Sequence, residues 1–535
     1  MLPKNNLDRR NFLKLLAKGG GAAAFGHLSL LNESLAASEN LSGYKALVCV
    51  FLRGGNDSFN MIIPSKHKDY AIYKKSRGEL AVNNKDLGLE SIDEKINNGS
   101  LGKGANNPYN VDGTASKAYT KGYYDLSNIG INLGVNGVMP ELAQLITNRK
   151  ASIIANIGNL VTPVTRSEIL KDSADLPLFL FAHNHQQRAL QTGQGNNLND
   201  VGWAGKIADN WADSNDNTSL GLNFSYSGNN RMLIGKSTAP LVLRAGDIPI
   251  FSGMAQDTNE LMNARRSLFR SLSDGYSNNH PLKSLYSNFI QNTITRTDIL
   301  SAAWNKNDTN FESLNNPYGE QLFNNPSAKD LGFKSGLLQG SLLKNLESIA
   351  KMIDVGAKEA KASGKAKRQI FYVNLDRFDN HNNQADTHPR LLRELSIGLW
   401  SFQKALETLQ HEKEVTTFTM SDFGRTLTPN TGHGTDHAWG GNQIVMGGAG
   451  DGSIGSFNGG RLIGDFPDLT LGGINDTNNR GRIIPTIAQD QLNATICNWF
   501  GVDKPSIASI FPNAMNFGDN QGDISSAFLD NFFVS

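Results

Sequence analysis

The sequence predicts an α/β fold, a three-layer α/β/α sandwich around a mostly parallel central sheet. Five short runs are apolar on both faces and rich in β-branched and aromatic residues, at 45–52, 151–156, 369–375, 415–420 and 443–446. Such runs are typical of strands that are covered on both sides. Helical patterns lie between them, and the alternation of helix and strand over 335–420 indicates βα units with parallel strands.

The first forty residues predict an export signal that precedes the fold. Residues 8–14 read DRRNFLK, a mildly apolar stretch follows over 15–31, and SLAA at 34–37 is a small-residue cleavage pattern. This combination is typical of a twin-arginine signal peptide, here residues 1–37, which addresses a folded protein for export. We therefore expect a partner in the twin-arginine export machinery and a periplasmic or secreted location. The alternative is a short amphipathic helix with two surface arginines.

The rest of the chain, 41–535, is expected to form a single domain. Hydrophobic residues make up 39% and charged residues 19% of the 535 residues, and the net charge is +1, so no charge excess indicates a nucleic-acid partner. No other run reaches the roughly 20 apolar residues of a membrane span, so we expect no transmembrane span in the mature chain. Cys49 and Cys497 lie in apolar runs and are expected to be buried free thiols, with a disulfide between them as the alternative.

Several segments are assigned from local patterns. Helices are expected at 140–147, 256–272, 282–304, 335–366 and 391–410. Residues 215–330, with Asn/Ser-rich turns followed by long helical stretches, are expected to be a helical insertion in the domain. Residues 84–128 are rich in Asn, Gly, Ser and Lys and are expected to be a long surface loop.

Carboxylates and imidazoles follow three of the expected strands. The residues concerned are Asp57 and Ser58 after 45–52, Asp379, His381 and His388 after 369–375, and Asp422, His433, Asp436 and His437 after 415–420. In an open α/β sheet, ligands bind beyond the carboxyl ends of the strands. Aspartate and histidine together are suited to a divalent metal, and imidazole favours Zn²⁺ or Mn²⁺ over Mg²⁺ or Ca²⁺. The pattern therefore predicts a metal site, with capping residues and salt-bridged loops as the alternative.

A second group of polar residues opens a helical pattern. His183, His185 and Arg188 lie close to one another there, and a helix N-terminus with such residues could hold an anion. Upstream, Thr165 places a hydroxyl beside Arg166. The alternative is a solvated surface helix start.

Seven short motifs carry a resemblance to a known family. They are VFLRGGND at 50–57, TPVTR at 162–166, HNHQQ at 183–187, GWAG at 202–205, FDNH at 378–381, SDFGRT at 421–426 and GTDH at 434–437. With the twin-arginine signal, they resemble the exported bacterial family called domain of unknown function 1501, which is related to the alkaline phosphatase and sulfatase superfamily. The resemblance implies an alkaline-phosphatase-like fold around a metal site.

The resemblance also implies roles for particular residues. The implied metal ligands are Asp57, Asp379, His381, Asp422, Asp436 and His437. The superfamily usually has a histidine directly after the aspartate of the third loop, but this chain has Phe423 there, so His437 or His433 would replace it. Candidates for catalysis are Thr165, Ser58 and His183, since Ala182 stands where the family pattern often has serine. Candidates for substrate binding are Arg166, Arg188, Arg425 and His185.

These expectations favour an exported metal-dependent hydrolase of phosphate or sulfate esters, with a small anionic ester as substrate. One alternative is a catalytically silent binding or scaffold protein of the cell envelope that retains the fold. Another is a metal-dependent enzyme that acts on a polysaccharide or its sulfate groups.

Overall fold

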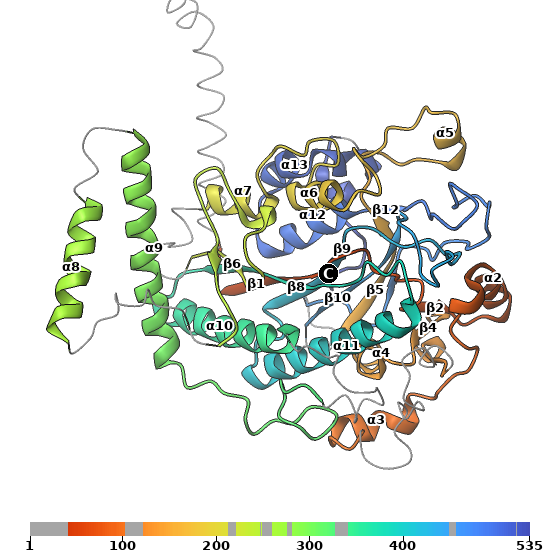
Figure 1. Ribbon diagram of the computed structural model, residues 1–535, viewed down its shortest axis with the longest axis horizontal. Helices are drawn as coiled ribbons and strands as arrows, with labels where there is room; N and C mark the ends of the chain where they lie inside the picture. The colour runs from red at the N-terminus through yellow and green to blue at the C-terminus, as the bar shows by residue number, and fades with distance from the viewer. Residues whose placement is uncertain are drawn as a thin grey trace, which may run out of the picture.

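The computed structural model describes residues 41–101, 121–211, 221–246, 248, 259–274, 281–326, 341–448, 456–520 and 522–534. Within these residues, nine strands form one sheet in the order β11-β5-β10-β9-β1-β8-β6-β7, with β12 also paired to β5 (Figure 1). The strands are β1 Tyr44–Leu52, β5 Ala151–Gly158, β6 Asn223–Ser225, β7 Leu241–Val242, β8 Lys367–Leu375, β9 Val415–Ser421, β10 Gly441–Gly447, β11 Leu462–Ile463 and β12 Ile487–Ala488.

The sheet is mostly parallel, as the sequence predicts. The central strand β1 pairs in parallel with both β8 and β9, whereas β10 runs antiparallel to its neighbours β5 and β9. All five predicted strands are present, because each is long and apolar on both faces. The strands that the pattern missed, β6, β7, β11 and β12, have only two or three residues. A run that short has no period to detect.

Helices cover both faces of the sheet, so the domain has three layers (Figure 1). The helices are α2 His67–Arg77, α3 Glu90–Asn97, α4 Pro140–Thr147, α5 Arg166–Leu170, α6 His183–Thr192, α7 Trp203–Asn210, α8 Glu260–Asp274, α9 Pro281–Lys306, α10 Ser341–Ser363, α11 Gln384–Leu409, α12 Gln489–Phe500 and α13 Lys504–Ile510. One face packs against α4, α10 and α11, and the other against α7, α12 and α13.

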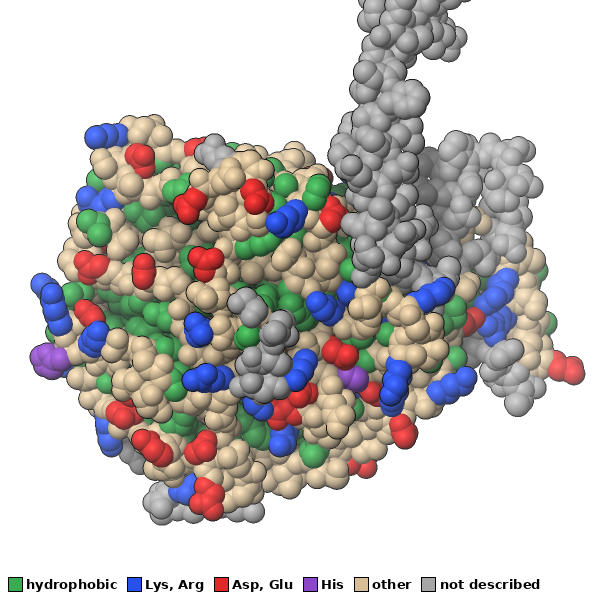
Figure 2. Space-filling view, turned by 180° about the vertical axis from the view of Figure 1, so that it is seen from behind, with side chains coloured by type: hydrophobic (Ala, Val, Ile, Leu, Met, Phe, Trp, Pro, Cys, Tyr) green, Lys and Arg blue, Asp and Glu red, His purple; other side chains and the backbone are tan. Residues whose placement is uncertain are grey.

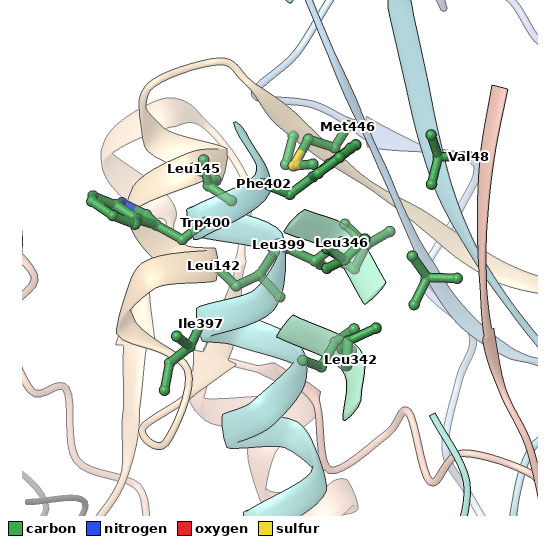
Figure 3. Packing of buried hydrophobic residues seen from close by; sticks show 14 of the residues in the cluster. Val48, Leu142, Leu145, Leu342, Leu346, Ile397, Leu399, Trp400, Phe402 and Met446 are labelled. Atoms are coloured by element: carbon green, nitrogen blue, oxygen red, sulfur yellow. The ribbon is translucent and has the colours of Figure 1, made fainter. Parts of the chain in front are cut away.

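The core forms because alternate residues of β1 point to opposite faces. Val48 and Val50 belong to the cluster with α4, α10 and α11, and Leu47, Cys49 and Phe51 belong to the cluster on the other face. Figure 3 shows apolar side chains of α4, α10 and α11 meeting one another on the first of these faces. The two clusters hold the strand ends in fixed positions, and the loops that follow those ends carry the polar residues.

Residues 84–128 differ from the long surface loop that we expect. They contain α3, whose Ile92 and Ile96 are buried, and β3 (Tyr123–Asp125). β3 pairs antiparallel with β4 (Leu133–Asn136), which pairs with β2 (Ile62–Pro64), so the three form a second small sheet. The prediction was wrong here because Asn and Gly dominate the composition while a few apolar residues at helical and strand spacing decide the structure. Residues 102–120 lie outside the described part of the chain.

Residues 215–330, expected as a helical insertion, hold both sheet and helix. β6 and β7 lie in this segment and extend the main sheet beyond β8. α8 and α9 pack on each other, and Arg266 and Arg270 of α8 both pair with Asp298 of α9 at 2.6 Å. Figure 1 shows α9 beside α10, with α8 farther from the sheet.

The remaining expectations concern the two cysteines and the chain ends. Cys49 and Cys497 are buried free thiols, as predicted, and burial raises the pKa of each. Among the described residues, no helix combines the length and the hydropathy that a membrane crossing requires. The expected signal peptide, residues 1–37, lies outside the described residues. Acidic and basic side chains are interspersed on the face seen in Figure 2.

Candidate metal centre

The carboxyl ends of β9, β1 and β8 lie side by side, since β1 is the middle strand of the three and pairs in parallel with both others. The loops that follow these strands therefore meet at one rim of the sheet. The N-terminus of α6 reaches the same rim, because His183 at its start contacts residues of the loops after β8 and β9. The convergence of the three loops agrees with the expectation from the sequence.

Four side chains meet at this rim. His183 Nε2 lies 3.1 Å from His437 Nε2 and 3.5 Å from Asp379 Oδ1, and His437 Nε2 lies 3.4 Å from Asp379 Oδ1. His381 Nε2 lies 2.9 Å from His437 Nε2 and 3.1 Å from Asp379 Oδ1. Ligand atoms around a tetrahedral Zn²⁺ with Zn–N distances of about 2.0–2.1 Å are separated by about 3.3 Å. The separations within the group of His183, His437 and Asp379, whose ligand atoms all lie within 4.8 Å of one another, match this value, and His381 lies beside this group.

The outer nitrogens of the imidazoles fix their tautomers. His183 Nδ1 lies 2.6 Å from Asp422 Oδ2, and His437 Nδ1 lies 2.7 Å from the carbonyl oxygen of Phe181. Both partners are acceptors only, so each Nδ1 carries the proton and donates. In this tautomer each Nε2 atom presents its lone pair toward the other ring and toward Asp379 Oδ1.

The third imidazole has a longer contact on its outer nitrogen than the other two. His381 Nδ1 faces Asp436 Oδ1 at 3.5 Å. Asp436 is held in turn by Asn430 Nδ2 at 3.0 Å and by Arg480 Nη1 at 2.8 Å. Histidines that bind a metal usually donate their other ring nitrogen to a carboxylate or a backbone carbonyl in this way.

The inward-facing atoms repel one another unless a positive charge lies between them. One proton could bridge only two of these atoms, whereas a cation at the middle would contact several at once. Burial lowers the pKa of His437, and the nearby charge of Arg425 lowers it further, which favours the neutral ring. Burial alone would raise the pKa of Asp379, but the hydrogen bond and the charge of Arg425 outweigh burial and lower it. The donor set of imidazoles and one carboxylate therefore fits Zn²⁺ or Mn²⁺.

The centre is open to solvent. The side chains are 46% exposed for Asp379, 40% for His381, 26% for His183 and 23% for His437. Structural zinc sites are closed by four protein ligands, whereas catalytic sites leave room for water or substrate. The exposure favours a centre that a substrate can reach.

A phenylalanine and two glycines position the imidazoles. The ring of Phe423 packs against those of His183 and His437, with centroids 4.7 and 4.6 Å apart. Gly55 lies against this ring, and a Cβ there would come within 2.8 Å of it. Gly54 has φ +115°, and a Cβ there would lie 2.5 Å from the backbone nitrogen of Asp379. Only glycine lets the loop after β1 pass this closely.

Arg425, expected to bind substrate, is buried and has other partners. Nε donates to the carbonyl of Gly55 at 3.0 Å, Nη1 to that of Thr435 at 2.9 Å, and Nη2 to that of Gly54 at 2.6 Å. Nη2 also pairs with Asp379. Arg425 therefore holds the loops together and orients Asp379, and it does not present a free guanidinium to an anion.

Asp57, expected as a metal ligand, lies away from the four converging groups. It is 2% exposed and accepts hydrogen bonds from Arg77 Nη2 and Gln384 Nε2. Arg77 also donates to the carbonyls of Thr426 and Leu427 at 3.0 and 3.1 Å. Asp57 therefore joins the loop after β1 to α2, with the guanidinium as its countercharge. Asp422 and Asp436 also differ from the expectation, because they orient histidines.

The two candidate hydroxyl nucleophiles have structural partners. Ser58 is buried, and its Oγ accepts from the backbone nitrogen of Asn442 at 2.6 Å. Thr165 is the N-cap of α5 and forms a capping box with Glu168. Arg166 donates from Nε to the carbonyl of Asp476 at 2.7 Å.

The other histidines lie outside the centre. His185 packs against the ring of Phe179, with centroids 4.3 Å apart, and Arg188 is exposed on α6. His388 is buried with Nε2 2.9 Å from Asn56 Oδ1, and burial lowers its pKa to about 4. His433 is exposed, and its Nδ1 lies 2.7 Å from Glu79 Oε1. Phe423 stands where a histidine was expected. Of the two candidates to replace that histidine, His437 lies at the centre and His433 does not.

Sequence reasoning missed the residues that act through another group. The Phe181 carbonyl and Gln187, whose Nε2 donates to Asp422 Oδ2 at 3.0 Å, both orient histidines. Gln187 lies in the HNHQQ motif one helical turn after His183, which is a usable signal. A backbone carbonyl leaves no signal in a sequence.

One family model matches part of the chain, and that family has no assigned function. Residues 360–511 match the model of a family described as "Protein of unknown function (DUF1501)". The match supports the resemblance that the motifs indicate. It includes Asp379, His381 and His437 of the centre, while His183 lies outside it. No curated protein matches the chain.

Two solved structures resemble the chain weakly. The one titled "Crystal structure of Ps i-CgsB in complex with k-i-k-neocarrahexaose" is 9% identical, with 86% of this chain and 72% of that chain covered and a TM-score of 0.29. The one titled "Crystal structure of Ps i-CgsB" is 10% identical, with 71% and 72% covered and a TM-score of 0.28. At these TM-scores the likeness supports neither a shared fold nor a shared function.

Proposed function

We propose that the protein is a metal-dependent hydrolase of phosphate or sulfate esters. Its metal would be held by His183, His437 and Asp379, with His381 beside them. One observation carries the proposal: the imidazoles turn their outer nitrogens to acceptors and their Nε2 atoms toward one another and a carboxylate. Imidazole lone pairs and a carboxylate that face one another in this way are stabilised by a cation among them. Zn²⁺ or Mn²⁺ is favoured over Mg²⁺ or Ca²⁺ because imidazoles dominate the set.

The bound metal would polarise an ester oxygen as a Lewis acid and lower the pKa of a water molecule. The chain itself orients the ligands. Asp422 and the Phe181 carbonyl hold two imidazoles in the tautomer that leaves Nε2 free, and Arg425 holds Asp379 ionised. Hydrolysis would consume one water molecule and release an alcohol together with phosphate or sulfate.

The surroundings favour direct attack by water over transfer to a side-chain hydroxyl. Ser58 is buried and bonded to Asn442, and Thr165 caps α5. Neither hydroxyl is held as a nucleophile beside a base, which covalent catalysis needs. The same observation favours the alternative function, a catalytically silent protein of the cell envelope that binds a metal or a partner through this rim.

The relation to the alkaline phosphatase and sulfatase superfamily is part of the proposal, as is export by the twin-arginine pathway to the periplasm or the medium. The mostly parallel sheet with an Asp/His rim at its carboxyl ends supports the first, and residues 1–37 of the sequence support the second.

The first experiment is elemental analysis of the purified protein, wild type against His437→Ala. We expect about one equivalent of Zn or Mn in the wild type and loss of most of it in the variant. His433→Ala is the matched control, because His433 lies in the same loop but pairs with Glu79, and it should keep the metal. A panel of phosphate and sulfate monoesters then tests turnover. Equal metal content in the wild type and His437→Ala would refute the centre, and bound metal without turnover would favour the silent protein.

A further inference from the structure

A mainly apolar groove lies outside the metal centre. One wall is residues 164–171, which include α5, and the other is the loop 472–486; the groove has a volume of about 770 Å³. Its apolar lining residues include Val164, Leu170, Ile474, Ile484 and Pro485. Leu170 is 59% and Ile474 is 77% exposed, although residues of this kind are usually buried. Apolar side chains on both walls of one groove indicate a binding surface.

Two residues next to the groove, Phe181 and Arg482, contact His437 of the centre. The carbonyl of Phe181, in the segment that leads from α5 to α6, accepts from His437 Nδ1 at 2.7 Å. Arg482, in the opposite wall, donates from Nε to the carbonyl of His437 at 3.0 Å and lies 4.1 Å above the Phe181 ring. Arg166 and Asp476 link the two walls through an Nε–carbonyl hydrogen bond of 2.7 Å. Phe181 and Arg482, both partly exposed, therefore form the surface that links the groove to the centre.

Cationic side chains lie along this surface. Arg166 lines the groove, Arg482 lies between the groove and His437, and Arg480 pairs with Asp436 beside His381. Arg480 is 43% exposed, so its guanidinium is accessible to an anion. Arg480 and Arg482 contact residues of the centre, whereas the groove is lined mainly by apolar side chains. A ligand with an anionic head and an apolar tail complements these two surfaces.

The segment between α5 and α6 is strained and exposes aromatic surface. Phe179 has φ +51° and Phe181 has φ +70°, values that cost about 1 kcal/mol or more for a non-glycine residue. Phe179 is 61% exposed and packs on the ring of His185. Strain of this kind persists where the surroundings enforce it, and it is concentrated at functional sites. It adds a second apolar surface on the same side of the centre.

We propose that the groove binds the apolar alcohol part of the ester substrate, so the substrate class is alkyl or aryl monoesters of phosphate or sulfate. This inference rests on the proposed function, because the anionic head is taken to lie at the metal centre. The apolar walls then select substrates by their tail, and the arginines between tail and head hold the charged group.

The test measures affinity and turnover for methyl, butyl and hexyl phosphate with the Zn²⁺-loaded protein, by calorimetry and by phosphate release. These esters stay monomeric in water at low concentration, so binding to an aggregate does not contribute. Full burial of a methylene strengthens binding about fourfold, and an open groove should give about twofold per methylene. We expect kcat/KM to rise by the same factor for each added methylene.

The variant Leu170→Ser/Ile474→Ser should reduce this dependence on chain length to nearly none. Both positions are exposed, so the substitutions remove little packing. The control is Leu261→Ser on α8, which is 67% exposed but remote from the centre and should keep the full dependence.

The outcomes separate the groove from the proposed function. Turnover that does not change with chain length would overturn the groove and leave the hydrolase standing. Affinity that rises with chain length and is lost in the double variant, without turnover, would support the groove and overturn the hydrolase. An increase in affinity with chain length that persists in the double variant, or that appears only with lipid vesicles, would also overturn the groove as a site for soluble esters.

Discussion

The imidazoles at the rim and the imidazole of His411 differ in whether they share an acceptor. His411 Nδ1 lies 2.8 Å from Glu414 Oε2, and its Nε2 lies 3.2 Å from Asp354 Oδ1, so both nitrogens can donate. The Nε2 atoms of the rim imidazoles instead share one carboxylate oxygen, Asp379 Oδ1, and those of His183 and His437 also face each other. A ring with its own acidic acceptor on each nitrogen keeps both protons, whereas rings gathered around one oxygen favour a cation among them. The sharing of an acceptor therefore distinguishes a structural cation from a candidate metal ligand.

The carboxylates show the same contrast. Asp57 and Asp379 follow the neighbouring strands β1 and β8, and both contact an arginine. Asp57 is 2% exposed and pairs with Arg77, which is fully buried. Asp379 is 46% exposed and also faces imidazoles. Position after a strand predicts where a carboxylate lies, but the groups around it determine what it does.

The largest expected effect comes from removing the countercharge of Asp57. Arg77→Met leaves a buried carboxylate unpaired, which should lower the free energy of unfolding by about 3–5 kcal/mol. Metal content should not change, because Asp57 lies outside the centre. Denaturant unfolding and elemental analysis measure the two quantities. The double variant Arg77→Met/Asp57→Leu should recover most of the stability. Loss of metal with stability unchanged would instead make Asp57 a ligand.

The next effect tests whether Asp422 orients a ligand. Asp422→Asn keeps an acceptor near His183 Nδ1 but removes the negative charge that strengthens the imidazole as a donor to the metal. Substitutions at such outer positions typically weaken metal binding about 10–100-fold. Competition with a chelator measures the affinity, and Asp376→Asn is the control, since Asp376 lies at the same rim, exposed, and pairs with Arg53 at 3.8 Å. Complete loss of metal would indicate that Asp422 binds the ion directly.

The contrast between the two kinds of imidazole also predicts a pH dependence of stability. Burial alone would lower the pKa of His411, but its hydrogen bonds to Asp354 and Glu414 raise it to about 9 from 6.5. Because the folded pKa exceeds the unfolded one, the contribution is complete below about pH 6.5 and is lost as the pH rises through about 9. After partial solvent screening we expect a loss of about 1–2 kcal/mol over this range.

Urea unfolding at pH 6, 7.5 and 9 measures this loss, with His411→Gln as the control. The glutamine side chain does not titrate, so the variant should be less stable than the wild type at pH 6. Its free energy of unfolding should change little between pH 6 and 9, except through other titrating groups. If the free energy of unfolding changed equally with pH in the wild type and the variant, His411 would hold no extra proton in the folded protein.

How far the sequence predicts the site depends on how local each interaction is. The strands β1, β8 and β9 and the convergence of their loops follow from long apolar runs and from the rule for parallel sheets. The partner of Asp57, by contrast, is Arg77, which lies 20 positions away on α2, and no local pattern indicates this pair. The Phe181 carbonyl that fixes His437 lies 256 positions away and has no side-chain signature. Such pairings depend on tertiary packing.

The smallest expected effect tests the outermost part of the rim. Gln187 Nε2 donates to the same Asp422 oxygen that accepts from His183, at 3.0 Å. Gln187→Ala removes one hydrogen bond to that carboxylate but leaves its charge and its contact with the imidazole. A hydrogen bond to a charged group contributes about 1.5–3 kcal/mol locally, and only part of this is transmitted through Asp422 and His183 to the metal.

We take about 1 kcal/mol to be transmitted to the metal, which corresponds to a roughly three- to tenfold loss of metal affinity in Gln187→Ala. This loss is smaller than the one expected for Asp422→Asn. Asn184→Ala is the matched control, because Asn184 is exposed in the same first turn of α6 and should leave the affinity unchanged. If Gln187→Ala weakens binding as much as Asp422→Asn, the amide acts on the metal or its ligand directly. Since each step outward from the centre should cost less, equal losses would contradict the layered arrangement in which carboxylates orient imidazoles and amides orient carboxylates.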